Sequence, residues 1–247
     1  MKNRIYNEKV DITNDNIKEF YDKRALKYRN GDKSQFTTVL LGDSNPEYAV
    51  AWDDYEKKNI LPLLMVSSEK NVLDIGCGIG RWADTLIPIC HKYVGTDFSN
   101  EMVKVARERF EHNNNCSFIN VSFQSVFEND NITQNKYDVV IIAGVSMYLN
   151  ENDLKECYRN LSKILNKDAI VYIEESVGIN QRLTLNHIWS ESLEDNYDAI
   201  YRTREEYISL MTSLIDECTI LKDEYIDVLY KKETSETSHW YIVMKKK

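Results

Sequence analysis

The sequence predicts an α/β fold in which a doubly wound, mostly parallel sheet of seven strands carries helices on both faces. Strand-like and helix-like runs alternate from Asn71 onward, which is typical of successive β-α units. The run 137–143 is apolar apart from Asp138, as expected of a parallel strand buried on both faces. Two final strands, 219–229 and 239–244, flank the polar turn 233–238 and form a hairpin. One strand at an edge of the sheet is therefore expected to be reversed.

The first half of the sheet begins with a short buried strand at 71–75, which breaks into the glycine segment 76–80 and a helix over 81–89. A second strand is predicted at 93–96. The helix after it begins at Ser99, a good N-cap, and places Val103, Ala106 and Phe110 at helical spacing. The third strand is expected at 117–121.

The second half contains the clearest helix of the chain, at 154–165. Its apolar residues recur at intervals of three and four: Leu154, Cys157, Tyr158, Leu161, Ile164 and Leu165. A fifth strand follows at 169–173. Thr203 and Glu206 form a capping box that opens a helix to about Ile215.

Residues 1–70 are predicted as an N-terminal helical cap over the ligand crevice, and residues 71–247 as the domain that carries the sheet. Within the cap, 17–28 has loose helical spacing, and Ser44 with Pro46 marks a helix that runs to about Ile60. The long connection 177–202 is expected to be a functional lid, because loops of that length are uncommon in compact domains.

Composition limits the possible partners. The chain has 247 residues, 43% of them hydrophobic, and its 31 Lys and Arg against 40 Asp and Glu give a net charge of −9. This charge repels polyphosphate, so no nucleic-acid partner is expected. No apolar window is long enough to span a membrane, and the first 20 residues contain no signal-like apolar core. Five scattered cysteines without a C-x-x-C pair favour reduced thiols and a cytoplasmic location. The oligomeric state is left open.

The glycine segment carries the first chemical signal. A glycine-rich turn between a strand and a helix lets a ligand approach the backbone closely. Nicotinamide and flavin sites use G-x-G-x-x-G/A, and Arg81 stands where that pattern would continue. Asp97 lies 23 residues after Asp74, the distance at which one β-α-β step brings a carboxylate beside a ribose diol.

With these residues, Val72-Leu73-Asp74-Ile75 before the Gly76-Cys77-Gly78-Ile79-Gly80 segment and Val94-Gly95-Thr96-Asp97-Phe98-Ser99 after it, the sequence closely resembles the class I S-adenosylmethionine-dependent methyltransferases. The resemblance implies S-adenosylmethionine as cofactor, with S-adenosylhomocysteine as product. It places the following positions at the cofactor: Asp74, Gly76, Cys77, Gly78, Gly80, Asp97, Phe98, Met102, Ser122, Phe123, Gln124, Ala143, Gly144 and Tyr28.

Two of these assignments depart from or extend the family pattern. Ser122 and Phe123 stand where the family commonly has Asp-Ala, so Ser122 or Gln124 would have to accept from the adenine amine. The segment from Tyr21 to Tyr28 resembles the Tyr-Asp-x-x-Ala-x-x-Tyr helix of many small-molecule methyltransferases, in which an aromatic side chain closes over the cofactor.

The residues that contact the acceptor are predicted from the segment after the strand 137–143 and from the lid. Ala143-Gly144-Val145-Ser146 lacks the Asn/Asp-Pro-Pro-Tyr pattern of nucleobase methyltransferases, which argues against a flipped base. Tyr148, Trp189 and Tyr201 are predicted to contact the acceptor. Arg202 would clamp a carboxylate or phosphate on it, with a surface salt bridge as the alternative.

A hydroxyl acceptor also needs a base. His187 in the lid is one candidate, and Glu175 and Glu174 at the end of the fifth strand are the others.

The sequence thus predicts a methyltransferase for a small polar acceptor such as a sugar, a nucleotide-sugar or a natural-product intermediate, with O-methylation preferred over N-methylation. A methyltransferase for proteins and a non-catalytic cofactor-binding sensor or partner are the alternatives. No metal is expected, because the clustered Asp/Asn set of the magnesium-dependent relatives is missing.

Overall fold

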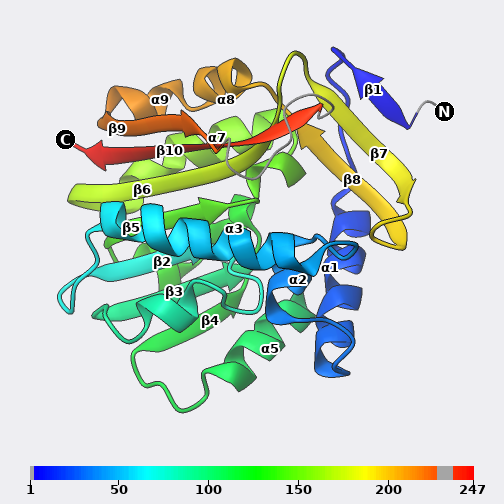
Figure 1. The fold of residues 1–247 in the computed structure, drawn as a ribbon. Coiled ribbons are helices and arrows are strands. Elements are labelled where there is room, and N and C mark those ends of the chain that lie inside the picture. The colour runs from blue at the N-terminus through cyan, green and yellow to red at the C-terminus, as the bar shows by residue number, and fades with distance from the viewer. Residues whose placement is uncertain (1–2, 227–235) are drawn as a thin grey trace.

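A computed structural model describes residues 3–226 and 236–247, and its centre is a seven-stranded sheet of order β4-β3-β2-β5-β6-β10-β9 (Figure 1). The strands are β2 (Asn71–Ile75), β3 (Lys92–Asp97), β4 (Cys116–Asn120), β5 (Tyr137–Ala143), β6 (Leu165–Gly178), β9 (Cys218–Tyr225) and β10 (Thr237–Lys246). Strands β2 to β6 pair in parallel, whereas β10 is antiparallel to both of its neighbours.

The predicted doubly wound, mostly parallel sheet is therefore confirmed, with one correction. The reversed strand β10 lies between β6 and β9, and the strand at that edge of the sheet is β9. Strand β10 pairs with β6 along nine residue positions, from Thr237 to Lys245, so its place in the sheet is set by this long ladder. The end of the predicted strand 219–229 and the first half of the predicted turn 233–238 lie outside the described residues, and residues 237 and 238 already belong to β10.

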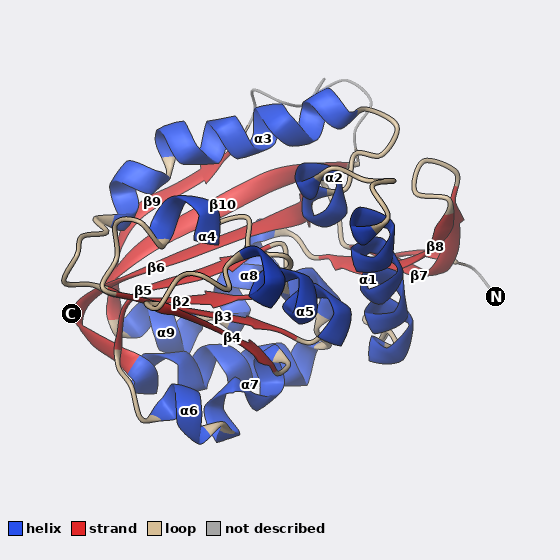
Figure 2. Ribbon diagram, turned by 90° about the horizontal axis from the view of Figure 1, so that it is seen from below, coloured by secondary structure: helices blue, strands red, loops and turns tan. Residues whose placement is uncertain are grey.

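Helices cover both faces of the sheet (Figure 2). One face carries α3 (Pro46–Asn59), α4 (Ala83–Leu86) and α5 (Asn100–Arg109), and the other carries α6 (Asp130–Thr133), α7 (Glu151–Leu161), α8 (Arg204–Leu210) and α9 (Thr212–Asp216). Strand β5 feeds both layers, because Val139 and Ile141 join one core while Val140 and Ile142 join the other. This is the two-residue alternation of a strand with two buried faces.

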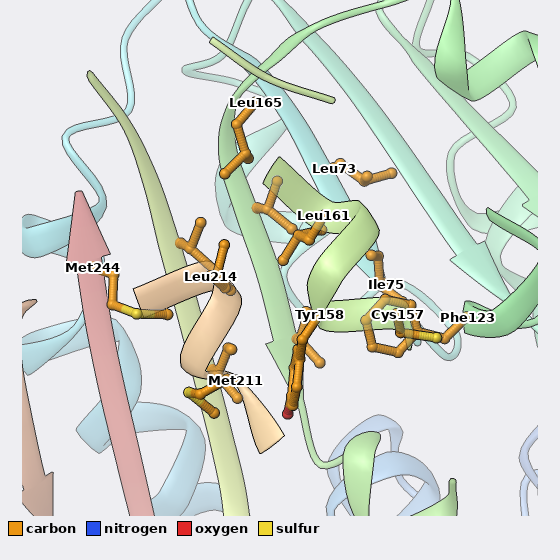
Figure 3. Close-up of a cluster of buried hydrophobic side chains, with 14 of the residues drawn as sticks. Leu73, Ile75, Phe123, Cys157, Tyr158, Leu161, Leu165, Met211, Leu214 and Met244 are labelled. Carbon is orange, nitrogen blue, oxygen red and sulfur yellow. The ribbon is translucent and has the colours of Figure 1, made fainter. Parts of the chain in front are cut away.

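The core on the α7 face follows the predicted apolar stripe. Leu154, Cys157, Tyr158 and Leu161 of α7 are all buried and pack with Leu73 and Ile75 of the sheet and with residues of α8 and α9 (Figure 3). Burial of such side chains contributes about 1.5 to 3 kcal/mol each. This packing fixes the position of the chain as it leaves β5, where the site begins.

Local signals predicted helix starts better than helix ends. Ser99 caps α5 by accepting from the Met102 amide, and Thr203 with Glu206 forms the predicted capping box of α8. The predicted helix 203–215 is interrupted at Met211, which divides it into α8 and α9. The predicted helix 81–89 is regular only over the four residues of α4.

The regions predicted as a helical cap and a lid are joined by a second sheet. Residues 3–70 contain α1 (Asn14–Arg29), α2 (Gln35–Leu40), α3 and a short 3-10 helix (Leu61–Leu64), but they begin with a strand, β1 (Arg4–Tyr6). Strand β1 pairs with the hairpin of β7 (Leu183–Ser190) and β8 (Asp195–Tyr201) in the order β1-β7-β8. The segment 177–202 is thus mostly regular strand rather than loop.

This small sheet lies against α1, as Figure 1 shows. Phe20 of α1 packs edge-on against Tyr197 of β8, with ring centroids 5.4 Å apart. Leu183, Leu185, Tyr197 and Ala199 are buried in the same cluster. Helix α1 is therefore held between the small sheet and the carboxyl ends of the large one. No helix within the described parts of the chain is both long and apolar enough to cross a membrane.

Candidate active site

A cavity of about 360 Å³ lies beyond the carboxyl ends of β2, β3, β4 and β5 and is closed on one side by α1 and α2. Twelve residues predicted from the sequence line it: Asp74, Gly76, Cys77, Gly78, Asp97, Phe98, Ser122, Phe123, Gln124, Ala143, Gly144 and Tyr148. The lining also includes Asn14, Lys18, Tyr21, Val39, Arg81, Trp82, Asn120 and Val145. This is the crevice expected for a ligand of a doubly wound sheet.

The glycine turn brings backbone to the floor of the cavity. Gly76 has φ +74°, and a Cβ there would lie 2.2 Å from the Val145 side chain. The amides of Gly76 and Cys77 both donate to the Thr96 carbonyl, which ties the turn to β3. Only glycine combines this conformation with so close an approach.

Asp97, at the end of β3, is anchored beside that turn. Its carboxylate accepts from the Gly78 amide at 3.0 Å and from the Ser99 amide at 2.8 Å, and it lines the cavity. Burial raises the pKa of Asp97 to about 6, against the opposing effect of the two amide hydrogen bonds. Each amide takes one direction of approach, so lone pairs remain to accept from a diol.

Two further charged residues, Asp74 and Arg81, flank the glycine turn in the sequence. Asp74 accepts from the Tyr93 hydroxyl, and burial raises the pKa of Asp74 to about 6. Arg81 is almost fully buried and forms ion pairs with Asp53 at 2.8 Å and Glu56 at 2.6 Å, both on α3. Arg81 thus links the glycine turn to α3.

Three aromatic residues also line the cavity: Tyr21 on α1, Phe98 after β3 and Tyr148 after β5. The hydroxyls of Tyr21 and Tyr148 lie 2.7 Å apart, and the Tyr148 hydroxyl is also 2.7 Å from that of Tyr197. Burial raises the pKa of Tyr21 to about 12 and that of Tyr148 well above its ordinary value, so both phenols are neutral at pH 7.

Tyr21 was missed as a site residue, although it begins the Tyr-Asp-x-x-Ala-x-x-Tyr pattern that could have identified it. Tyr28, the residue chosen from that pattern, packs instead beside the cluster of Ala25, Ile79, Met102 and Val105. Met102 is buried in the same cluster, and Gly80 faces Phe110. None of Tyr28, Met102 and Gly80 lines the cavity, so their predicted cofactor contacts stay predictions.

Glu174 and Glu175 point to opposite faces of β6, as successive strand residues do. The Glu174 carboxyl lies 2.6 Å from Nδ1 of His239 on β10, and neither glutamate lines the cavity. Glu175 accepts from the amides of Val145, Ser146 and Met147. Both candidate bases are therefore hydrogen-bonded to other groups of the protein.

Arg202 is also occupied. Its guanidinium is fully buried and donates to the carbonyls of Ser146 at 3.0 Å and Leu149 at 2.6 Å. It does not line the cavity, and because it is fully buried it forms no surface salt bridge within the described residues. Sequence reasoning missed this arrangement because backbone carbonyls leave no trace in a sequence pattern.

The remaining predicted residues lie on the small sheet. His187 and Trp189 are on β7, with 57% of the His187 side chain and 59% of Trp189 exposed. The His187 ring is 3.3 Å from the Asn16 amide, and Tyr201 packs at the border of the α1 cluster. None of the three lines the cavity. Among residues 3–226 and 236–247, no group of three His, Cys, Asp or Glu is close enough to hold a metal ion.

The sheet order, the glycine turn and the acid after β3 together define the fold of the class I S-adenosylmethionine-dependent methyltransferases. A family model described as "Methyltransferase domain" matches residues 72–168, the segment that runs from β2 into the start of β6.

Two phosphoethanolamine N-methyltransferases are among the similar proteins. The chain is 25% identical over 213 residues to phosphoethanolamine N-methyltransferase 1 of Caenorhabditis elegans, a match that covers 83% of this chain and 40% of the relative. The solved structure of the Haemonchus contortus phosphoethanolamine N-methyltransferase 1, with phosphoethanolamine and S-adenosylhomocysteine, has a TM-score of 0.67 at 20% identity and covers 95% of this chain and 49% of that one. The chain thus spans less than half the length of these relatives.

The fold is shared more widely. The [4+2]-cyclase SpnF has a TM-score of 0.63 at 14% identity, covering 96% of this chain and 97% of that one. A likeness of this degree concerns the fold alone, and the chemistry has to be argued from the site.

Proposed function

We propose that this protein transfers the methyl group of S-adenosylmethionine to an amine nitrogen of a small acceptor that carries no phosphate. The observation that supports this most is that one cavity is lined both by a glycine turn with the Asp97 carboxylate and by the paired phenols of Tyr21 and Tyr148. When bound, the cofactor supplies an activated methyl group on its sulfonium sulfur. The protein then has to bind, enclose and align the two reactants.

The residues present fit this cofactor. Asp97 can accept from both ribose hydroxyls, and Gly76 lets the backbone approach the methionine portion without a side chain in the way. Asn120 donates to the carbonyls of Asp97 and Phe98 and so stiffens the loop beside the ribose position. Ser122 and Gln124 line the cavity where an adenine edge would lie, and they supply its polar partners.

Tyr21 and Tyr148 in the cavity lining favour an amine over a hydroxyl acceptor. A hydroxyl has to lose its proton to a base during transfer, whereas an amine can lose its proton to solvent before it binds. Within the described residues, the carboxylates that line the cavity are Asp74 and Asp97, and both are assigned to the cofactor. Tyr21 and Tyr148 are poor bases at neutral pH, because burial raises the pKa of each phenol. Their hydroxyl oxygens can instead accept from the N–H groups of a neutral amine, and their rings can pack against its carbon atoms.

The cavity charges support an acceptor without phosphate, in contrast to the substrate named for the relatives. The cationic side chains in the described lining are Lys18 and Arg81. Lys18 is paired with Asp22 at 2.8 Å, and Arg81 with Asp53 and Glu56. A phosphate dianion would have to displace these carboxylates, and the net charge of −9 would oppose its approach.

The experiment is methyl transfer from labelled S-adenosylmethionine to a panel of acceptors by the purified chain. The panel holds small primary and secondary amines, phosphoethanolamine, sugars and short peptides. We expect methylated product with amines and little with phosphoethanolamine. Product with sugars alone would restore the hydroxyl acceptor favoured by the sequence, and product with peptides alone would point to a protein methyltransferase. Cofactor binding without any product would favour the sensor role.

A further inference from the structure

The turn that carries Tyr148 is held from both sides by two buried polar side chains. The 145–149 turn leaves β5 and supplies Val145, Tyr148 and Leu149 to the cavity lining. On one side the Glu175 carboxylate accepts from three consecutive amides, at 3.2 Å from Val145, 2.6 Å from Ser146 and 3.1 Å from Met147. On the other side the Arg202 guanidinium donates to the carbonyls of Ser146 and Leu149.

Both side chains are completely buried, each with 0% exposure, and burial raises the pKa of Glu175 to about 8 against the opposing effect of its hydrogen bonds. Burying a polar group is costly, and hydrogen bonds to partners inside the protein offset that cost. Here the partners are the main-chain groups of one turn, which cannot rotate away as side chains can. The Tyr158 hydroxyl adds a third contact by donating to Ser146 Oγ at 2.9 Å.

We propose that Glu175 and Arg202 are positioning residues that hold the 145–149 turn and thereby fix the Tyr148 hydroxyl for the acceptor. The inference rests on the proposed function. Neither residue lines the cavity, so each acts through the turn. Tyr148 is the member of the turn whose hydroxyl meets both Tyr21 of α1 and Tyr197 of β8. A shift of the turn would break both contacts at once.

The same turn also reaches the glycine turn, because Val145 lies against Gly76. We call Glu175 and Arg202 together the clamp. The clamp therefore sets the distance between Tyr148 and the glycine turn. A displacement of about 1 Å at a reacting centre can reduce the rate by about 100-fold. Loss of the clamp should accordingly affect turnover much more than cofactor affinity, since the glycine turn is anchored separately on Thr96.

The test uses Glu175→Gln and Arg202→Lys in the full chain, with Glu205→Gln and Arg204→Lys of α8 as matched controls. Glu205 is exposed, and Arg204 is partly exposed and pairs with Asp223. We expect kcat with the amine acceptor to fall roughly 10- to 100-fold in the first pair, with an unchanged dissociation constant for S-adenosylhomocysteine. The controls should keep the wild-type kcat. Equal losses in both pairs would overturn the inference.

A double-mutant cycle with Tyr148→Phe separates positioning from general stability. If Glu175 acts through Tyr148, the loss of kcat caused by Glu175→Gln should be clearly smaller in the Tyr148→Phe background than in the wild type. A full additional loss there would show that Glu175 does not act through this hydroxyl and would contradict the proposal.

A readout that needs no turnover keeps the inference separate from the proposed function. Fluorotyrosine introduced at position 148 should give a single ¹⁹F resonance in the wild type and a shifted or broadened one in Glu175→Gln and Arg202→Lys. Unchanged resonances in both variants would overturn the clamp even if no acceptor is methylated. Conversely, perturbed resonances together with an inactive wild type would leave the clamp intact and reject only the proposed function. Should Glu175→Gln not fold, Arg202→Lys decides by the same criterion.

Discussion

The hydroxyl groups of Tyr21 and Tyr148 lie 2.7 Å apart, although 127 positions separate the two residues in the chain. One belongs to α1 and the other to the turn after β5, so their contact joins the N-terminal region to the crevice of the large sheet. The ring centroids are 5.6 Å apart in an edge-to-face arrangement. Both side chains line the same cavity as the glycine turn, and we propose that the acceptor meets the cofactor beside this pair.

Removing either hydroxyl should impair turnover. We expect Tyr148→Phe and Tyr21→Phe each to lower kcat by roughly fivefold or more, since one hydrogen bond is worth about 1 kcal/mol. Cofactor affinity, measured by titration calorimetry, should stay near the wild-type value. Tyr225→Phe, on the edge strand β9, is the control and should be fully active. Weaker cofactor binding in Tyr148→Phe would place that side chain at the cofactor instead.

Asp97→Asn should weaken S-adenosylmethionine binding by about 1.5 to 3 kcal/mol, the usual loss for a charge-assisted hydrogen bond. The amide keeps the size of the side chain and one acceptor oxygen, so the fold should be retained, as a thermal melt would check. Asp153→Asn, exposed in the first turn of α7, is the matched control. Identical affinities in the two variants would remove Asp97 from the ribose site.

Cofactor affinity should also depend on pH. The ionised Asp97 accepts from the ribose hydroxyls, and the pKa of this group is about 6 because it is buried. Affinity is therefore full above this pKa and is lost as the pH falls through it. At pH 5 the dissociation constant should be about tenfold higher than at pH 7. Asp97→Asn should abolish most of this dependence. Asp74 also has a pKa of about 6, so a slope lost in Asp74→Asn but kept in Asp97→Asn would reassign it.

The glycine turn offers a steric test with an internal control. Gly76 and Gly31 both have positive φ, but a Cβ at Gly76 would lie 2.2 Å from Val145, whereas nothing is within 4 Å at Gly31. The conformational strain of alanine, about 1 to 2 kcal/mol, applies to both positions. Gly76→Ala should be less stable than Gly31→Ala by a further 1 to 3 kcal/mol, roughly, from overpacking. Urea denaturation measures the difference, and equal midpoints would contradict the close approach.

The role of His187 as a base stays a prediction that one variant decides. The placement of its exposed ring on β7, outside the cavity lining, predicts that His187→Ala retains most of the wild-type turnover. General-base catalysis would instead require a loss of about 100-fold to 10,000-fold. A loss of that size, with unchanged cofactor affinity, would mean that the small sheet moves toward the cavity during catalysis.

The sequence predicted those parts of the molecule whose signals are local. Strands β2 and β5 have the predicted bounds, because each is a short apolar run that ends in glycine or polar residues. The glycine turn and Asp97 were found for the same reason, since their spacing follows from a single β-α-β unit. The capping residues Ser99 and Thr203 act within one helical turn.

The parts that could not be predicted depend on contacts between distant segments. Strand β1 has three residues and becomes a strand only by pairing with β7. Arg202 was read as a substrate clamp because a guanidinium among aromatic residues suits an anionic ligand, yet its partners are two carbonyls more than 50 positions away. Tyr21 could not be chosen over Tyr28 from the pattern alone, because the choice depends on how α1 is rotated against the sheet.

The pairing of β1 with β7 has a consequence for the order in which the protein folds. It joins residues 4–6 to residues 183–185, so the intervening residues 7–182 have to close into a loop before the small sheet exists. Pairings between segments this distant in sequence form slowly, because the entropy of loop closure has to be overcome first. The parallel core from β2 to β6 draws on residues 71–178 alone and can form without that closure. During synthesis on a ribosome, strands β2 to β6 can therefore pair before the β7–β8 hairpin has emerged. Strand β1 can pair only after it.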